Sequence, residues 1–185
     1  MIAILALQGA FTEHKYVLDS LNVPCFEIRK LSHLQNTFKG LILPGGESTA
    51  MGRLLIDLEL LIPLRELIQK GLPVFGTCAG LILLAKKLEN ETKTHLATMD
   101  MTIRRNAYGR QSGSFFTNDK FADINIPMTF IRAPVITEVR NGLILSQVNG
   151  HIAAARQNNQ LVTTYHPELK TDVVHKYFLK MTSAA

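Results

Sequence analysis

The chain has 185 residues, of which 46% are hydrophobic and 19% charged, and its formal net charge is +5. A chain of this length can bury roughly 70% of the surface that it exposes when unfolded, so we expect one ordered domain over residues 1–185 rather than a disordered protein. The basic residues are scattered, which argues against nucleic acid as a partner. The six histidines show no ligand spacing with each other or with cysteine, so no metal site is expected.

The first apolar run covers residues 2–7 and ends at Gln8-Gly9. It lacks a basic leader and is far too short to cross a bilayer, so we interpret it as a strand and expect a cytoplasmic protein without a membrane segment. Thiols in that compartment stay reduced, and a domain with a large core needs no covalent bridge. We therefore expect Cys25 and Cys78 to be free, with Cys25 in the core.

In the first half of the chain, apolar runs of strand length alternate with segments of helical periodicity. One helix is predicted to begin at a cap provided by Ser48 or Thr49 and to be interrupted at Pro63. Continuous apolar strands are typical of a sheet buried on both faces, so the pattern predicts a parallel sheet covered by helices. The predicted strands are 2–7, 23–28, 40–43 and 72–77, and the predicted helices are 10–21, one with apolar residues between 51 and 61, 64–70, and one after Cys78.

The second half differs, because short strand-like segments follow one another without long helices between them. Asn141-Gly142 and Asn149-Gly150 are turn signals between some of these segments. We expect antiparallel additions to the sheet and one closing helix over about 171–181. The predicted strands are 99–104, 112–117, 129–132, 135–139, 143–148, 152–156 and 161–165.

Around Cys78, an apolar strand, a cysteine flanked by Gly76 and Gly80, and an apolar helix follow one another directly. This spacing is typical of a nucleophile elbow, in which a strained turn lifts the central side chain above the sheet. Unpaired N–H groups at a helix start favour the thiolate, and the N–H of Ala79 would face a developing oxyanion. A buried structural cysteine beside two turn glycines is the other interpretation.

A second candidate group, His166-Pro167-Glu168, follows the last predicted strand. Pro167 biases His166 toward an extended backbone, where residues two apart point the same way, so Glu168 could orient the imidazole toward a thiol. A strand-ending turn with a surface histidine is the alternative. The elbow cysteine in the same chain favours the catalytic interpretation, because ligands bind beyond the carboxyl ends of parallel strands.

Glycines also follow the predicted strand 40–43, in the loop Pro44-Gly45-Gly46-Glu47-Ser48. The N–H of Gly46 would serve as a second oxyanion donor beside Ala79, although glycines after a strand more often mark a turn. A phosphate-binding loop is disfavoured, because the lysine and the spacing of a P-loop are missing.

Taken together and in this order, the elbow, the glycine loop and the His-Pro-Glu group resemble the class I, triad-type glutamine amidotransferases. Further segments are similar to the glutaminase subunits of pyridoxal 5'-phosphate synthase, and the similarity runs from Ile2 to the last helix. The resemblance implies a three-layer α/β/α sandwich with a mixed, mostly parallel central sheet. The segments that narrow the resemblance are 7–10, 105–106, 109–111, 114–115, 130–134 and 166–169.

The same resemblance implies an enzyme that hydrolyses L-glutamine to L-glutamate and ammonia through a cysteine thioester, with no cofactor of its own. The ammonia would pass to a separate barrel-shaped synthase subunit that builds pyridoxal 5'-phosphate. By position, Cys78 is the nucleophile, His166 the general base and later acid, and Glu168 the residue that orients it. The implied substrate-binding residues are Gly46, Glu47, Ser48, Arg105, Ile131 and Arg132.

Several residues qualify the resemblance. Gln8 matches a residue near the oxyanion loop and the synthase contact, and a simple loop glutamine is the alternative. Arg105 or Arg132 could pair with the glutamine α-carboxylate or form a structural ion pair. Arg104 stands where an acidic residue is expected before Arg105, and Tyr165 stands where phenylalanine is usual.

Two other functions stay open at this point. A glutaminase of another pathway would share the triad and serve a different acceptor subunit. A non-catalytic binding subunit would keep the fold, although the intact set of Cys78, His166 and Glu168 argues against it.

Overall fold

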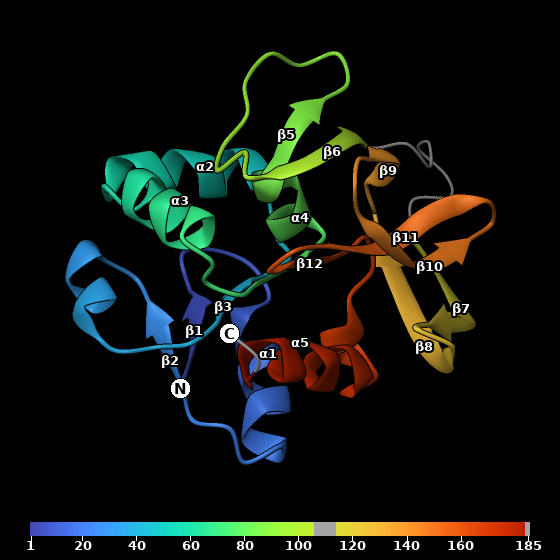
Figure 1. Cartoon of the computed structure of the whole chain (residues 1–185), viewed down its shortest axis with the longest axis horizontal. Helices are drawn as coiled ribbons and strands as arrows, with labels where there is room; N and C mark the ends of the chain where they lie inside the picture. The colour runs from blue at the N-terminus through green and yellow to red at the C-terminus, as the bar shows by residue number, and fades with distance from the viewer. Residues whose placement is uncertain (106–113, 184–185) are drawn as a thin grey trace.

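A ten-stranded sheet crosses the molecule and carries helices on both faces, as Figure 1 shows for the computed structural model. The structure describes residues 1–105 and 114–183. Over these residues the strand order is β2-β1-β3-β4-β12-β11-β9-β6-β5, with β10 paired to β11, and a separate two-stranded sheet consists of β7 and β8.

Five strands form the parallel part of the large sheet, through the pairings β2-β1, β1-β3, β3-β4 and β4-β12. Thr77 of β4 pairs with Thr163 of β12, so these two strands end level with each other. Cys78 and the loop that contains His166 therefore emerge at the same edge of the sheet, where ligands bind in open α/β folds. The bounds are β1 Ile2–Leu5, β2 Cys25–Ile28, β3 Leu41–Leu43, β4 Val74–Thr77 and β12 Gln160–Thr163.

The parallel strands are apolar on both faces because each face has its own core. Along β1, Ala3 and Leu5 belong to one buried cluster, whereas Ile2 and Ile4 belong to the other. Helices α2, α3 and α4 contribute to the first cluster and helices α1 and α5 to the second, which confirms the three-layer α/β/α sandwich. The bounds are α1 Phe11–Ser20, α2 Ser48–Asp57, α3 Leu61–Gln69, α4 Ala79–Leu84 and α5 Val173–Ser183.

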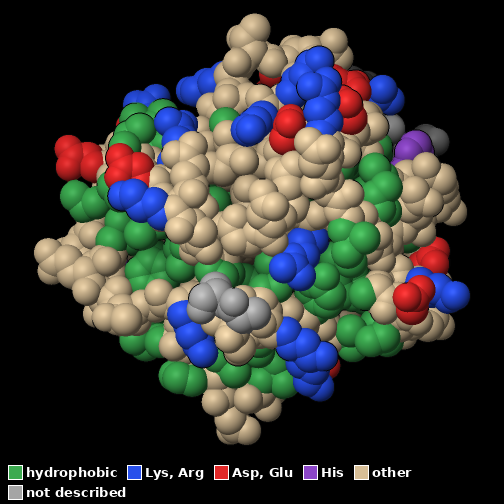
Figure 2. All heavy atoms as spheres, viewed as in Figure 1, with side chains coloured by type: hydrophobic (Ala, Val, Ile, Leu, Met, Phe, Trp, Pro, Cys, Tyr) green, Lys and Arg blue, Asp and Glu red, His purple; other side chains and the backbone are tan. Residues whose placement is uncertain are grey.

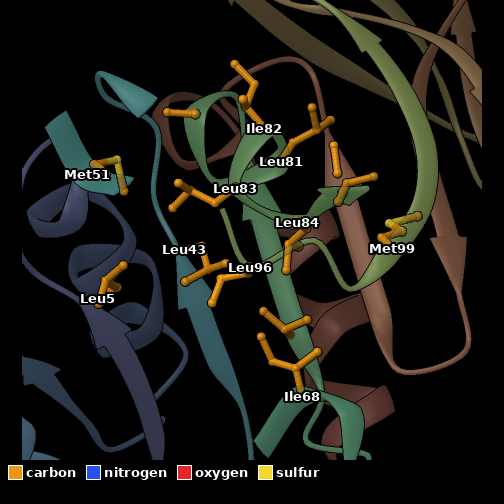
Figure 3. Close-up of a cluster of buried hydrophobic side chains, with 14 of the residues drawn as sticks. Leu5, Leu43, Met51, Ile68, Leu81, Ile82, Leu83, Leu84, Leu96 and Met99 are labelled. Atoms are coloured by element: carbon orange, nitrogen blue, oxygen red, sulfur yellow. The ribbon is translucent and has the colours of Figure 1, made fainter. Parts of the chain in front are cut away.

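Figure 3 shows part of the first cluster, including side chains of α4. Leu43 of β3, Met51 of α2 and, from α4, Leu81 and Leu84 all belong to it. These side chains are fully buried, and each such burial contributes about 1.5–3 kcal/mol relative to an exposed side chain. The short helix α4 that follows Cys78 is thus held in place by its apolar residues rather than by its length.

The other strands of the large sheet are mainly antiparallel. β11 pairs with β12, β9 and β10, and β6 pairs with β9, all in antiparallel fashion, whereas the edge pair β5-β6 is parallel. Asn149 and Gly150 both have positive φ, as a tight hairpin turn between β10 and β11 requires. The bounds are β5 Ala85–Leu88, β6 Met99–Arg104, β9 Val135–Val139, β10 Leu143–Val148 and β11 His151–Gln157.

The hairpin of β7 (Ser114–Phe121) and β8 (Ile124–Ile131) corrects the expectation that all late strands join the large sheet. It packs its own buried face, with Phe115 and Phe130 stacked at 4.4 Å, against the cluster that α5 covers. The backbone N–H of His166 donates to the carbonyl of Thr129 in β8, which ties the hairpin to the loop after β12. Residues 112–113 of the predicted strand lie outside the described residues.

One local prediction was wrong, that of a helix break at Pro63. Residues 85–88 form the edge strand β5, which no sequence pattern indicated, because Lys86 and Lys87 are both exposed and do not alternate with buried residues. Pro63 lies in the first turn of α3, where a missing N–H is tolerated. Asn141-Gly142 lies between β9 and β10, as its turn signal predicts, although these two strands do not pair with each other in the described sheet.

The cap of α2 also differs from the prediction, since Glu47, and not Ser48 or Thr49, occupies the N-cap position. Its carboxylate accepts hydrogen bonds from the N–H groups of Thr49 and Ala50, at 2.9 and 2.7 Å. A short 3-10 helix, η1 (Leu31–Gln35), lies in the predicted connection 29–39, and another, η2 (Pro167–Leu169), follows His166.

Candidate functional site

Cys78 lies between β4 and α4 with a strained backbone, at φ 47° and ψ −100°. Positive φ is uncommon for a residue with a side chain and persists only where the surroundings enforce it. Here the N–H of Cys78 donates to the carbonyl of Thr163 in the neighbouring strand β12, at 2.9 Å. The arrangement is the nucleophile elbow that the residue spacing predicts.

The two flanking glycines are required by close backbone contacts. A Cβ on Gly76 would lie 2.8 Å from the carbonyl carbon of Gly80, and a Cβ on Gly80 would overlap the carbonyl oxygen of Leu43. Since the atoms in the way are backbone atoms, no side-chain rotation could relieve either contact. The glycines thus let the helix turn back directly over the sheet.

His166 and Glu168 extend from the loop after β12 toward Cys78. Nδ1 of His166 lies 2.7 Å from Oε1 of Glu168, and the Cys78 side chain is near enough to the imidazole to raise its pKa. An Nδ1–H that donates to the carboxylate leaves Nε2 free to serve the thiol. All three residues are buried, with 8%, 7% and 7% of their surfaces exposed for Cys78, His166 and Glu168. The structure therefore brings together the three residues of the predicted triad.

The charges of this group depend on one another. Burial alone would lower the pKa of His166, but its hydrogen bonds with Cys78 and Glu168 and the nearby carboxylate charge outweigh burial, and the pKa is raised. Burial alone would raise the pKa of Glu168, but the neighbouring His14 and His166 outweigh it, and the pKa is lowered. The histidine is thus set to hold a proton beside an ionised carboxylate.

A pocket of about 520 Å³ opens in front of Cys78 and His166. Its walls come from the loops after β1, β3, β4, β6 and β8 and from the loop after β12. The predicted residues Gln8, Gly46, Glu47, Ser48, Arg105, Ile131 and Arg132 all line it, together with Gly9, Ala10, Gly45, Ile82 and Pro134. Ala79 and Glu168 do not line the pocket: Ala79 is the first residue of α4, and Glu168 lies behind the imidazole of His166.

The loop after β3 is held in position by the loop after β1. Oε1 of Gln8 accepts the N–H of Glu47 at 2.7 Å, and the carbonyl of Gly45 accepts the N–H of Ala10 at 2.9 Å. A Cβ on Gly45 would overlap the imidazole of His166, and a Cβ on Gly46 would overlap the Gln8 side chain. The two glycines therefore allow the imidazole and the Gln8 amide to approach this loop, a reason that the sequence alone did not reveal.

Arg105 forms ion pairs at the rim of the pocket. Its guanidinium lies 3.1 Å from Oε2 of Glu91 and 3.4 Å from Oε1 of Glu47, and it donates to the Thr49 hydroxyl at 3.3 Å. The side chain keeps 25% of its surface exposed and still faces the pocket. Arg104, in contrast, pairs with Glu89 at 2.7 Å, so the charge that departs from the family pattern is offset outside the pocket.

Ile131, the last residue of β8, and Arg132 after it also line the pocket. Arg132 is exposed and has φ 42°, which gives the chain a sharp change of direction after the strand. The sequence segment from Asn106 to Gln111, part of the resemblance, lies outside the described residues.

Two buried histidines near the triad, His14 and His175, were missed by the sequence analysis. A signal existed, because His14 lies four residues before Leu18 on the buried face of α1, and a titratable residue on an apolar face needs a polar partner. That partner comes from another helix, α5, and no local pattern could have identified it.

Charged side chains elsewhere are dispersed. On the face in Figure 2, basic side chains stand in small separate groups, several of them beside acidic ones. Within residues 1–105 and 114–183, no three His, Cys, Asp or Glu side chains are grouped to hold a metal ion. No helix in the described part of the chain is long and apolar enough to cross a membrane.

Comparison with known proteins agrees with this geometry. Residues 4–184 match the SNO glutamine amidotransferase family. Two relatives named pyridoxal 5'-phosphate synthase subunit PdxT, from Streptococcus pneumoniae strains ATCC 700669 / Spain 23F-1 and 70585, are each 56% identical over 97% of this chain and 96% of their own length.

Solved structures give the same result. A crystal structure titled glutamine amidotransferase is 35% identical, covers 98% of both chains and superposes with a TM-score of 0.93. The structure of PurLQS from Thermotoga maritima, only 14% identical, has a TM-score of 0.65 over 90% of this chain and 86% of its own, which shows a shared fold alone. With the family match over nearly its full length and relatives of this similarity, the chain belongs to the SNO glutamine amidotransferase family.

Proposed function

We propose that this chain is a cytoplasmic glutaminase domain that hydrolyses L-glutamine and delivers the ammonia to the barrel subunit of a pyridoxal 5'-phosphate synthase. The observation that carries the proposal is the strained Cys78 with its His166–Glu168 pair at the base of one pocket. The name of the relatives, which are 56% identical, supports the choice of this pathway over that of another glutaminase.

In the proposed reaction, the thiolate of Cys78 attacks the side-chain amide carbon of glutamine and forms a tetrahedral intermediate. The N–H groups of Ala79 and Gly46 would stabilise its oxyanion. His166 donates a proton to the leaving nitrogen, so ammonia departs and a thioester remains. The imidazole then takes a proton from water, whose oxygen attacks the thioester and releases glutamate and the free thiol.

Recognition of the amino-acid end of glutamine would involve the pocket rim. Arg105 supplies a cation for the α-carboxylate, and Glu47 supplies an anion for the α-ammonium group. The backbone of Gly46 and Ser48 and of the Ile131–Arg132 pair would complete the binding site. Both charged side chains already contact each other at 3.4 Å, so substrate would replace part of an existing ion pair.

Gln8 would connect the oxyanion loop to the synthase. Its side chain accepts the N–H of Glu47 next to Gly46, so a partner that moves Gln8 would also move the oxyanion loop. We therefore expect weak hydrolysis by the chain alone and faster hydrolysis in the complex.

An ammonia-release assay with the cognate synthase added and omitted tests the proposal. The synthase should raise the rate, and Cys78→Ala should abolish it, while Cys25→Ala at the second, partly buried cysteine should keep it. Equal rates with and without synthase would contradict the coupling. Ammonia release by Cys78→Ala would contradict the nucleophile.

A further inference from the structure

Behind the triad lies a pair of histidines that the reaction above does not use. His14 comes from α1 and His175 from α5, and both are 0% exposed. Nδ1 of His14 lies 2.9 Å from Nε2 of His175, so one ring donates a hydrogen bond to the other. Two helices far apart in the sequence thus meet through polar side chains inside an otherwise apolar layer.

The His14 ring faces the triad with its other nitrogen. Nε2 lies 3.7 Å from Oε2 of Glu168 and 3.2 Å from the hydroxyl of Thr77, the residue before Cys78. The other carboxylate oxygen of Glu168, Oε1, accepts a hydrogen bond from Nδ1–H of His166. Oε2 is buried and has no hydrogen-bond partner among the described residues, so the 3.7 Å contact with His14 is an electrostatic one, on the side of the carboxylate that His166 does not use.

The proton positions follow from electrostatics. A bare Nε2 lone pair of His14 would repel the ionised carboxylate, whereas an Nε2–H attracts it. His14 then accepts at Nδ1, which requires His175 to donate from Nε2. In this arrangement Nδ1 of His175, which has no partner among the described residues, is only an unused acceptor. The opposite arrangement would leave a buried N–H without an acceptor at that atom, which is costly.

Burial disfavours the charged form of both rings. Burial lowers the pKa of His14, although the Glu168 charge opposes this, and it lowers the pKa of His175 well below its ordinary value. Phe75 makes edge contacts with both rings, at centroid distances of 5.9 and 5.5 Å, which limits their rotation. In the neutral form that burial favours, His14 presents a fixed N–H dipole to the carboxylate.

Resting on the glutaminase function proposed above, we propose that His14 is a positioning residue, whose Nε2–H, fixed by His175, holds Glu168 so that Oε1 stays on His166. Without it the carboxylate could turn away from the imidazole, and His166 would lose the orientation that it needs toward Cys78. Small displacements of a positioning group can lower a rate by about a hundredfold.

Two amide substitutions separate this role from simple packing. In His14→Gln the amide nitrogen takes the place of Nε2 and can still donate toward Glu168. In His14→Asn the amide takes the place of Nδ1 and reaches only His175. Both variants are polar and smaller than histidine, so a role in packing alone predicts similar losses for the two.

The assay compares kcat and KM for glutamine in complex with the synthase. We expect His14→Gln to keep kcat within about threefold and His14→Asn to lose about tenfold or more, with KM within about twofold in both. Equal kcat values for the two variants, or a loss confined to KM, would overturn the proposal. If His14→Asn does not fold, His175→Gln and His175→Asn can be compared in the same way. His175 acts on Glu168 only through His14, so we expect a smaller difference in kcat between these two variants.

Alkylation of Cys78 by iodoacetamide, in chains that also carry Cys25→Ala, gives a readout without glutamine or synthase. The alkylation rate should fall several-fold in His14→Asn and stay near the parent rate in His14→Gln, since a misplaced His166 no longer activates the thiol. Equal rates in the two variants would overturn the positioning role. A parent complex that releases no ammonia would instead refute the glutaminase function, and the alkylation comparison would still test the positioning role.

Discussion

The rear and the rim of the pocket are held by different kinds of interaction. At the rear, the Glu168 carboxylate lies 2.7 Å from Nδ1 of His166 and 3.7 Å from Nε2 of His14, and the side chains of Glu168, His14 and His175 are fully buried. At the rim, Arg105 pairs with Glu47 and Glu91 through side chains that are 25%, 54% and 38% exposed. Removing one partner of a buried charge pair lowers the free energy of unfolding by several kcal/mol, whereas an exposed pair contributes only about 0–1 kcal/mol.

We infer that the rear of the pocket serves the chemical step and that the rim serves the recognition of glutamine. The rear has one arrangement that leaves none of its buried N–H groups without an acceptor, so it keeps the imidazole in one orientation toward Cys78. The rim consists of ion pairs that water can replace at little cost, so glutamine can displace them when it binds. A change at the rear should therefore alter kcat, and a change at the rim should alter KM.

The largest effect is expected at the rear. Glu168→Gln removes the charge that orients and stabilises the His166 imidazolium, and kcat for ammonia release in the complex should fall at least about a hundredfold with KM little changed. Glu138→Gln, which breaks an exposed ion pair with Arg140, is the control and should act like the parent chain. A kcat within tenfold of the parent would show that the rear does not govern the chemistry.

At the rim, Arg105→Ala should raise KM for glutamine by about tenfold or more and leave kcat within a few-fold, because a charged hydrogen bond to the α-carboxylate is lost. Arg104→Ala is a matched control, since the neighbouring arginine pairs with Glu89 outside the pocket. Similar KM values for the two variants would assign Arg105 to a structural ion pair instead.

The buried histidines should also make stability depend on pH. Burial, aided by His14, lowers the pKa of His175 from its ordinary value of 6.5, so below that pH the unfolded chain binds a proton that the folded chain excludes. The free energy of unfolding should fall with decreasing pH by up to about 1.4 kcal/mol per pH unit from this residue. In His175→Phe, denaturant unfolding between about pH 7 and about pH 5 should show a smaller loss. Equal losses would mean that the ring is not buried in its neutral form.

The smallest effect concerns Tyr165, whose buried hydroxyl has no hydrogen-bond partner among the described residues. Burial raises the pKa of this phenol. Tyr165→Phe should increase the free energy of unfolding by about 1 kcal/mol, measured in urea, without changing kcat. Tyr177→Phe is the control, because its hydroxyl contacts Arg156 and its removal brings no such gain. Destabilisation by Tyr165→Phe would reveal a partner for the hydroxyl.

The local patterns of the sequence determined a large part of this protein. Apolar runs marked the strands β1, β3 and β4, because a strand buried on both faces has apolar residues throughout. The spacing of Gly76, Cys78 and Gly80 indicated the elbow, because the backbone contacts of so tight a turn exclude side chains at both ends. Such features depend on residues a few positions apart, and a sequence displays them directly.

Only the tertiary structure decided which distant residues serve these features. The pairing of β12 with β4 places His166 beside Cys78, and the packing of α1 and α5 on one face of the sheet brings His14 and His175 together behind Glu168. The tertiary structure also decided that β7 and β8 form a separate hairpin and that Arg105 pairs with Glu91. Each is a contact between segments that no local periodicity relates, because it arises when elements pack against one another and buried polar groups must find partners.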